Sequence, residues 1–189
     1  MIIGKRNIMK YTNYSGGAIG ADTEFEIEGE KYNVKTVAFS FNDHISYSKN
    51  KKNLNKLELI EGFEHVGKAN LTLNRNVSNL STYVKNLLSR NWFQVKNSEA
   101  IFAIGKLKLD NIVDGGTGWA VQMGIDNGKK VYVFDQNKCN WYKYDYELSK
   151  FEKINYIPPL TEKFAGIGSR EINENGKKAI KDLFLANFT

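Results

Sequence analysis

The chain has 189 residues, of which 41% are hydrophobic and 25% are charged. These proportions are typical of a globular protein and exclude a disordered chain, a collagen-like chain and a coiled coil. A single cysteine allows no internal disulfide, and no apolar run approaches the roughly 20 residues of a membrane-spanning helix. We therefore expect one domain over residues 1–189, in a reducing, cytoplasmic compartment, with no signal peptide and no membrane contact.

The net charge of +6 fits two classes of partner. One is a nucleic-acid surface, and the other is a pocket for a small anion such as a nucleotide. The basic residues are scattered, with only short clusters such as Lys49–Lys52, as on a solvated surface. Two histidines and one cysteine, widely spaced, give no metal-site pattern, so the sequence predicts neither a metal nor a cofactor.

Short β-rich runs alternate with amphipathic stretches along the chain. The pattern predicts strands at residues 11–15, 36–41, 100–104, 130–134 and 164–167, and helices at 23–32, 54–71, 79–93, 119–126 and from about Ile172 onward. The Lys- and Asn-rich insert 46–59 is either a mobile lid or a solvated connection, and residues 141–157 form a β-hairpin excursion. This order predicts an α/β fold, a Rossmann-like and mostly parallel sheet flanked by helices.

Three of the predicted strand-to-helix turns are rich in glycine. They are Tyr14–Asp22 (YSGGAIGAD), Asp114–Trp119 (DGGTGW) and Phe164–Arg170 (FAGIGSR). Glycine lets a ligand approach the backbone closely, and amides at a helix start favour an anion. Parallel strands bring all three turns to one sheet edge, so we expect an anion site there. Neither the phosphate-loop pattern nor the strict G-x-G-x-x-G fingerprint is present.

Together, the motifs Ser15–Asp22, Gly115–Gly118 and Gly166–Arg170 resemble the SLOG superfamily. That group contains the Lonely Guy phosphoribohydrolases, the DNA-processing protein A fold and sensor domains of antiviral defence systems. The resemblance covers most of the α/β framework at the level of motifs. It implies a sheet that binds a nucleotide or nucleotide derivative.

The order of the motifs departs from that family. In the relatives the strand with the G-x-G-S-R turn comes first, whereas here this unit closes the chain. We interpret this as a circular permutation, in which the C-terminal strand and helix complete the sheet beside residues 11–15. The alternative is that this unit swaps into a partner chain.

The second turn also departs from the hydrolases of the family, whose pattern is G-G-x-G-T-x-x-E. Trp119 replaces the Thr, and Gln122 occupies the position of the catalytic Glu. An amide can hydrogen-bond a ribose or a base, but it cannot serve as a carboxylate base. This favours a binder over an enzyme, although Asp22, Asp114 or Glu24 could substitute, and the catalytic residues stay unknown.

For several side chains the sequence leaves two roles open. Asp22 either caps its helix or contacts a ribose hydroxyl, and Ser169 either caps the last helix or binds phosphate. Arg170 can clamp an anion, while Arg90, Asn91 and Gln94 can line the ligand edge. His44 is either a loop histidine or a phosphate or acid–base contact. The alternation of Tyr142, Tyr144 and Tyr146 indicates a strand that packs on the sheet, stacks on bases or contacts a second subunit.

The sequence therefore predicts a protein that binds a nucleotide-derived small molecule. The resemblance implies that it sequesters a defence-signalling nucleotide, ADP-ribose-like or cyclic, as a viral counter-defence protein in the bacterial cytoplasm. The alternatives are an N-glycosidase acting on nucleoside monophosphates and a DNA-binding protein, the last disfavoured. Because many relatives pair, a homodimer or higher homo-oligomer is expected. The predicted ligand-binding residues are Ser15, Gly16, Gly17, Ala18, Gly20, Asp22, Arg75, Arg90, Asn91, Gly115, Gly116, Thr117, Gly118, Gln122, Gly166, Gly168, Ser169 and Arg170.

Overall fold

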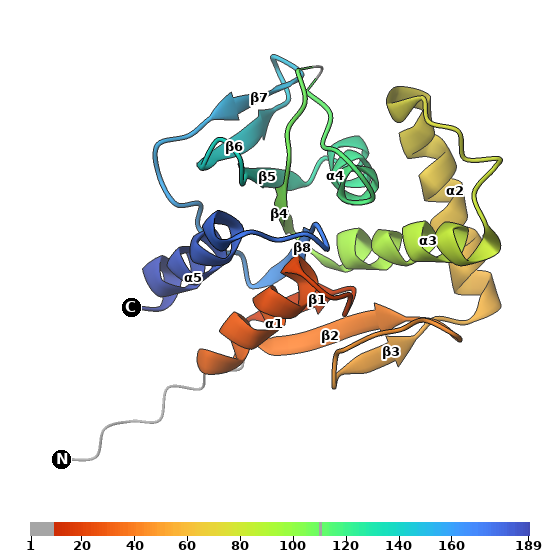
Figure 1. Cartoon of the computed structure of the whole chain (residues 1–189), viewed down its shortest axis with the longest axis horizontal. Coiled ribbons are helices and arrows are strands. Elements are labelled where there is room, and N and C mark those ends of the chain that lie inside the picture. The colour runs from red at the N-terminus through yellow and green to blue at the C-terminus, as the bar shows by residue number, and fades with distance from the viewer. Residues whose placement is uncertain (1–9, 110) are drawn as a thin grey trace.

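The computed structural model describes residues 10–109 and 111–189. The expectation that the chain has no signal peptide concerns N-terminal residues that lie almost entirely outside this described part. Within the described residues, eight strands form one sheet in the order β3-β2-β1-β8-β4-β5-β6-β7. The first six strands of this order are parallel, while β6 pairs antiparallel with both β5 and β7. The fold is therefore the predicted α/β, Rossmann-like sheet (Figure 1).

The predicted elements are present with boundaries shifted by a few residues. The strands are β1 Thr12–Ser15, β2 Lys35–Ser40, β3 Lys51–Asn53, β4 Ala100–Gly105, β5 Lys130–Asp135, β6 Asn140–Asp145, β7 Lys150–Lys153 and β8 Lys163–Gly168. The helices are α1 Ala21–Lys31, α2 Lys56–Leu73, α3 Thr82–Asn97, α4 Thr117–Asp126 and α5 Glu174–Phe188. None of the helices in the described residues is long and apolar enough to cross a membrane.

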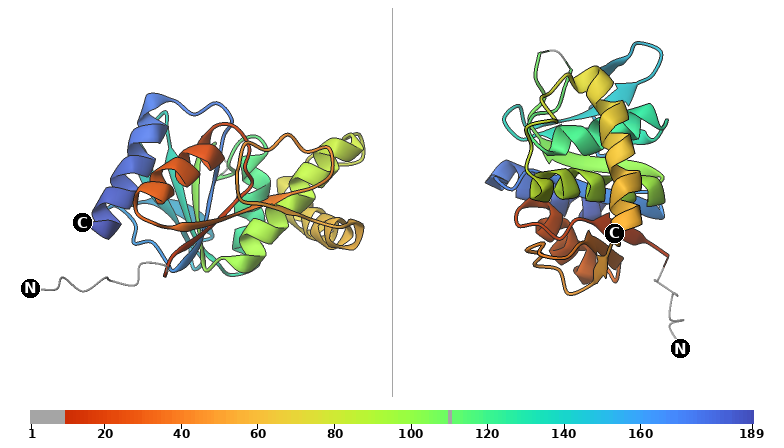
Figure 2. Two further views of the ribbon diagram at one scale, coloured as in Figure 1. Left: turned by 90° about the horizontal axis from the view of Figure 1, so that it is seen from below. Right: turned by 90° about the vertical axis from the view of Figure 1, so that its right-hand side faces the viewer.

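Helices cover both faces of the sheet, as the two views of Figure 2 show. Helices α1 and α5 pack on one face, where Phe164 of β8 contacts both Phe102 of β4 and Phe184 of α5. Helices α2, α3 and α4 form the layer on the other face, against Ile101 and Ala103 of β4. Residues of β4 thus alternate between two cores, which explains why the strand is a continuous apolar run buried throughout.

The C-terminal strand β8 lies between β1 and β4 in the middle of the sheet. Thr12 of β1 is paired with Lys163, and Ile101 of β4 with Ala165. The last strand therefore completes the sheet of its own chain beside β1, in the position that was expected for it. The chain does not have to exchange this unit with a partner to form the sheet.

The hairpin of β6 and β7 extends the sheet beyond β5 rather than leaving it. Trp141 packs into the core on the α1–α5 side, while Tyr142 and Tyr144 pack against the other core. Tyr146 is exposed and donates a hydrogen bond from its hydroxyl to the Lys129 carbonyl at 2.6 Å. Tyr142 and Tyr144 thus belong to a sheet-packing strand, whereas Tyr146 lies in the turn after it. In the insert 46–59, residues 51–53 form the edge strand β3, so only its first part is a loop.

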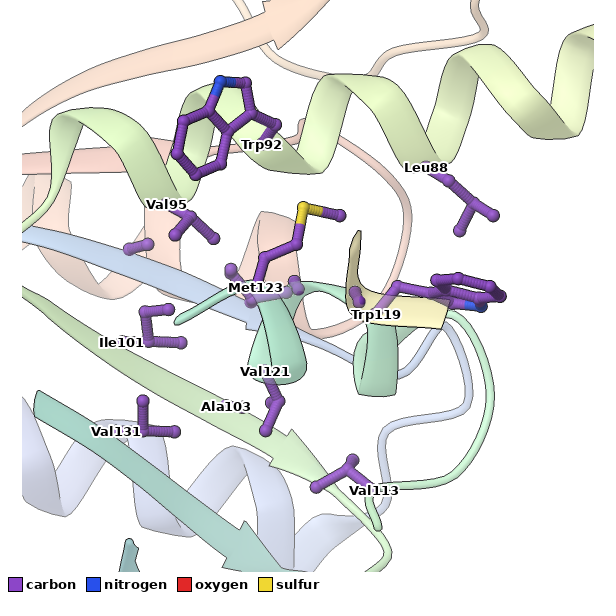
Figure 3. Packing of buried hydrophobic residues seen from close by; sticks show 14 of the residues in the cluster. Leu88, Trp92, Val95, Ile101, Ala103, Val113, Trp119, Val121, Met123 and Val131 are labelled. Atoms are coloured by element: carbon purple, nitrogen blue, oxygen red, sulfur yellow. The ribbon is translucent and has the colours of Figure 1, made fainter. Parts of the chain in front are cut away.

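Helices α3 and α4 pack closely over β4 and β5. Figure 3 shows α3 and α4 facing each other through Leu88, Val95, Trp119 and Met123, with Ile101, Ala103 and Val131 of the strands beside them. Trp92 of α3 instead stacks on His65 of α2. Helix α2 packs against α3 at Gly62, which lies close to the backbone of Ser89. A Cβ on Gly62 would fall 2.3 Å from the Ser89 carbonyl oxygen. Helix α2 buries Gly62, Val66, Ala69 and Leu73, while Leu57 and Ile60 are exposed.

Candidate anion-binding site

The three glycine turns line one cavity of about 980 Å³ at the carboxyl ends of the parallel strands. Ala18 and Asp22 come from the first turn, Gly115 and Gly116 from the second, and Gly168 from the third; Ile19, Thr117, Ser169 and Arg170 also line it. The first and second turns are 92 residues apart in sequence, from Asp22 to Asp114, and the second and third are 45 residues apart, from Trp119 to Phe164; the parallel sheet brings them together. The predicted meeting of the turns at one sheet edge is confirmed.

The second turn places the start of α4 at the cavity. Gly116 is the N-cap residue, and no side chain caps the helix; in contrast, Asn55, Ser81 and Asn173 cap α2, α3 and α5. A Cβ added to Gly115 or Gly116 would meet no atom within 4 Å. The start of α4 therefore faces open space, and the partial positive charge of this helix end is directed at it. The Gly118 and Trp119 amides bond the carbonyls of Gly115 and Gly116.

Arg75 fixes the shape of this turn. Its Nη1 donates to the Gly115 carbonyl at 2.7 Å and its Nη2 to the Val113 carbonyl at 2.9 Å. Its guanidinium also lies 5.6 Å from the centre of the Trp119 ring. These contacts tie the loop between α2 and α3 to the second glycine turn. Arg75 lines the cavity, as predicted, and supports the turn by bonds to main-chain oxygens.

Asp22 joins the first and third turns. Its Oδ2 accepts a hydrogen bond from the Gly16 amide at 3.1 Å, and its Oδ1 accepts one from the Gly168 amide at 3.2 Å. The expectation that Asp22 caps α1 is wrong, because Gly20 is the N-cap and no side chain forms a capping hydrogen bond with the first amides of the helix. Burial raises the pKa of Asp22 to about 6, against the opposing influence of Arg90 and the Gly168 amide.

Arg90 is the most unusual side chain of the site. It is 5% exposed, lines the cavity, and has no hydrogen-bond partner for Nε or Nη1 among the described residues. Its nearest anionic group is Asp22, whose Oδ2 lies 3.6 Å from Nη1, beyond hydrogen-bond distance. Burial lowers the pKa of Arg90, while Asp22 acts to raise it. A buried cation with unused donors is costly unless another acceptor completes its shell.

The third turn carries Ser169 and Arg170 at the rim of the cavity. Ser169 Oγ accepts a bond from the Glu171 amide at 3.0 Å, and its carbonyl accepts the Ala21 amide at 3.0 Å. The reading of Ser169 as the cap of the last helix is wrong, because Asn173 caps α5 through the Gly176 amide. Arg170 is exposed and lines the cavity, where a guanidinium can reach an anion from solvent.

Some predicted residues shape the turns from behind and do not line the cavity. A Cβ on Gly20 would lie 2.5 Å from the Ser169 carbonyl oxygen, and one on Gly118 would lie 2.0 Å from that of Val113.

Ser15 is buried, donates to Glu26 and accepts the Gly17 amide. Gln122 bonds Asp126 one turn further along α4 at 2.8 Å. The remaining predicted residues that do not line the cavity are Gly16, Gly17 and Gly166.

Asn91 lines the cavity next to Arg90, as predicted, whereas Gln94 is fully buried and donates to the Tyr14 carbonyl. Sequence reasoning missed Lys106 and Gln136, which follow β4 and β5 and also line the cavity. The rule that ligands bind at the carboxyl ends of parallel strands could have found both. The sequence analysis also missed Tyr47 and Tyr83 as cavity-lining residues, because their positions depend on how the β2–β3 loop and α3 pack.

His44, considered as a phosphate or acid–base contact, lies at the same cavity. Its Nδ1 is 2.9 Å from Ser40 Oγ, and its ring stacks on Phe41. Burial, followed by the charges of Arg90 and Lys51, lowers the pKa of His44 to about 4. The imidazole is therefore neutral near pH 7 and adds no positive charge for an anion.

Comparison of the chain with protein-family models, with curated proteins and with solved structures finds no match.

Proposed function

We propose that this protein binds a nucleotide-derived small molecule, with a phosphate group held between the start of α4 and Arg90. The supporting observation is that one cavity is lined both by the start of α4, which no side chain caps, and by the buried guanidinium of Arg90, whose counter-ion Asp22 lies 3.6 Å away. A phosphate has the charge and the acceptor oxygens to complete both. Lys106 and Arg170 add positive charge around it. The resemblance to SLOG proteins, which rests on the same turns, points to the same class of ligand.

The first test identifies the ligand that the protein retains. Full-length protein purified from cells is measured by native mass spectrometry, and any molecule released on denaturation is identified. Binding of AMP, ADP-ribose and cyclic AMP is then measured by isothermal titration calorimetry. We expect at least one phosphorylated nucleotide to bind, and binding to none of these probes together with no retained molecule would contradict the proposal.

Gly116→Ala tests whether the ligand lies against the start of α4. The added methyl group meets no protein atom within 4 Å, so it intrudes only on what enters the cavity. Losing one hydrogen bond to a charged group costs about 1.5–3 kcal/mol, which weakens the Kd by about 10- to 150-fold. Gly67→Ala is the matched control, because Gly67 also has open space around its Cβ position but lies on α2, outside the cavity. Equal affinities of the two variants would place the ligand elsewhere.

A second candidate function is hydrolysis of the N-glycosidic bond of a nucleoside monophosphate. The observation in its favour is Asp22, a cavity-lining carboxyl whose pKa is raised to about 6. Such a group can exchange a proton near neutral pH. Incubation of the protein with AMP separates the two functions. Release of adenine over many turnovers, abolished by Asp22→Asn, would identify an enzyme; intact AMP would support a binder.

A further inference from the structure

An apolar rim surrounds part of the cavity and is not explained by anion binding. Ile19, Ile45, Tyr47 and Tyr83 all line the cavity, and their side chains are 56%, 69%, 61% and 39% exposed. They come from three separate segments: the first glycine turn, the loop between β2 and β3, and α3. Large apolar side chains that gather in one concave place mark a surface that another apolar group covers.

Neighbouring contacts hold this rim in place. The Tyr83 ring lies edge-on to Phe41 at 5.6 Å, and Phe41 stacks on His44 at 5.0 Å. The amide of Tyr47 donates to the Gly17 carbonyl at 2.8 Å, which attaches the β2–β3 loop to the first glycine turn. The rim is thus connected to the same turn that helps to form the anion site.

Helix α3 joins the rim to the anion site. Tyr83, Leu87 and Arg90 are spaced four and three residues apart, so they follow one another along a single face of the helix. All three line the cavity, and Tyr83 lies about 10 Å from Arg90 along the helix axis, at 1.5 Å per residue. One wall therefore changes from apolar to cationic over two turns.

We propose that this rim, centred on Tyr83, is a nucleobase subsite, so that the protein selects nucleoside phosphates over sugar phosphates. A nucleotide carries a flat base and a charged phosphate at the two ends of a ribose, and the wall offers a surface for each in the same order. Bases stack on aromatic side chains regardless of their identity. A purely anionic ligand would leave the rim uncovered, and a purely apolar one would leave Arg90 without an acceptor. The inference rests on the proposed function, since the phosphate fixes which end of the ligand faces the rim.

The test compares AMP with ribose 5-phosphate, which shares the phosphate and sugar but has no base. The affinity of the full-length protein for each is measured by isothermal titration calorimetry, for the wild type and for Tyr83→Ala. Alanine substitution of a stacking aromatic residue weakens binding by roughly 5- to 150-fold. We expect this loss for AMP and no change for ribose 5-phosphate. Tyr156→Ala is the control, because Tyr156 is exposed but does not line the cavity.

The outcomes separate the two proposals. Equal affinity of the wild type for AMP and ribose 5-phosphate would overturn the base subsite and leave the phosphate site intact. Equal losses for both ligands in Tyr83→Ala would also overturn it, because the tyrosine would then act on the phosphate site or on the fold. To keep the fold under control, Tyr83→Phe retains the ring against Phe41 and should bind AMP as the wild type does. Binding of neither ligand, with no other phosphorylated nucleotide bound, would overturn the proposed function itself.

Discussion

Gly16 and Gly116 look alike in the sequence, each within a glycine pair at a turn, but the structure gives them opposite roles. A Cβ on Gly16 would fall 1.3 Å from Arg90 Nη1 and 2.5 Å from Asp22 Oδ2. The Arg90 side chain is long, but it is buried, so it can move only by separating from Asp22. Gly16→Ala should therefore destabilise the protein, whereas Gly116→Ala should not.

The expected sizes follow from these contacts. Overpacking a filled site costs about 1–3 kcal/mol, and breaking a buried ion pair costs about 3–5 kcal/mol. Because the two effects overlap, we expect Gly16→Ala to lose about 3 kcal/mol, which lowers the Tm by roughly 6–12 °C in a domain of this size. Gly116 has helical backbone angles, φ −63° and ψ −32°. Alanine is allowed there and should stabilise by about 0.4–1 kcal/mol through the unfolded state.

The assay is urea unfolding of both variants and the wild type at pH 7, followed by circular dichroism, with thermal melts as a second measure. The opposite signs of the two changes are the informative result, because composition and exposure alone would not distinguish two glycines in similar turns. A Gly16→Ala variant with a Tm within about 2 °C of the wild type would refute the reasoning. It would mean that Arg90 leaves its position at little cost and does not form a fixed part of the site.

Two further predictions concern stability. The pKa of Asp22 is about 6 in the folded state against 3.8 in the unfolded state, so the folded state holds the Asp22 proton more tightly. Ionisation of Asp22 therefore lowers the free energy of unfolding by about 3 kcal/mol, and this loss develops as pH rises from about 4 to 6. In urea unfolding, the free energy of unfolding of the wild type should therefore rise relative to that of Asp22→Asn as pH falls through that range. A difference between the two proteins that does not change with pH would contradict the raised pKa. Gly62→Ala should cost about 1–3 kcal/mol, because its Cβ would lie 2.3 Å from the Ser89 carbonyl oxygen and force α2 from α3. Gly67→Ala on the same helix meets no atom within 4 Å and should be neutral or stabilising, so equal melting temperatures would argue against the close α2–α3 contact.

Local pattern was enough to predict the central strands of the sheet and the turns that follow them, although it missed the short, exposed edge strand β3. The apolar run Ala100–Ile104 is buried on both faces, and such a run is typical of a strand inside a parallel sheet. Glycine marks places where the backbone needs a positive φ or close neighbours, as at Gly17, with φ 62°, and Gly20, with φ 105°. Because parallel strands all point the same way, the meeting of three turns at one edge also followed from the pattern.

Side-chain roles were decided by the tertiary structure. Nothing near Asp22 in the chain indicates that its carboxylate bonds the Gly168 amide, 146 residues away, rather than the start of its own helix. The exposure of Tyr83 and the burial of Arg90 on one face of α3 depend on what α3 packs against, which hydrophobic periodicity does not specify. The position of β8 between β1 and β4 likewise depends on long-range pairing, since the order of strands in a sheet is set by which strand edges are still unpaired when the last strand is added. Local propensities therefore determined the strands, helices and turns, and long-range packing determined which charges and rings share the cavity.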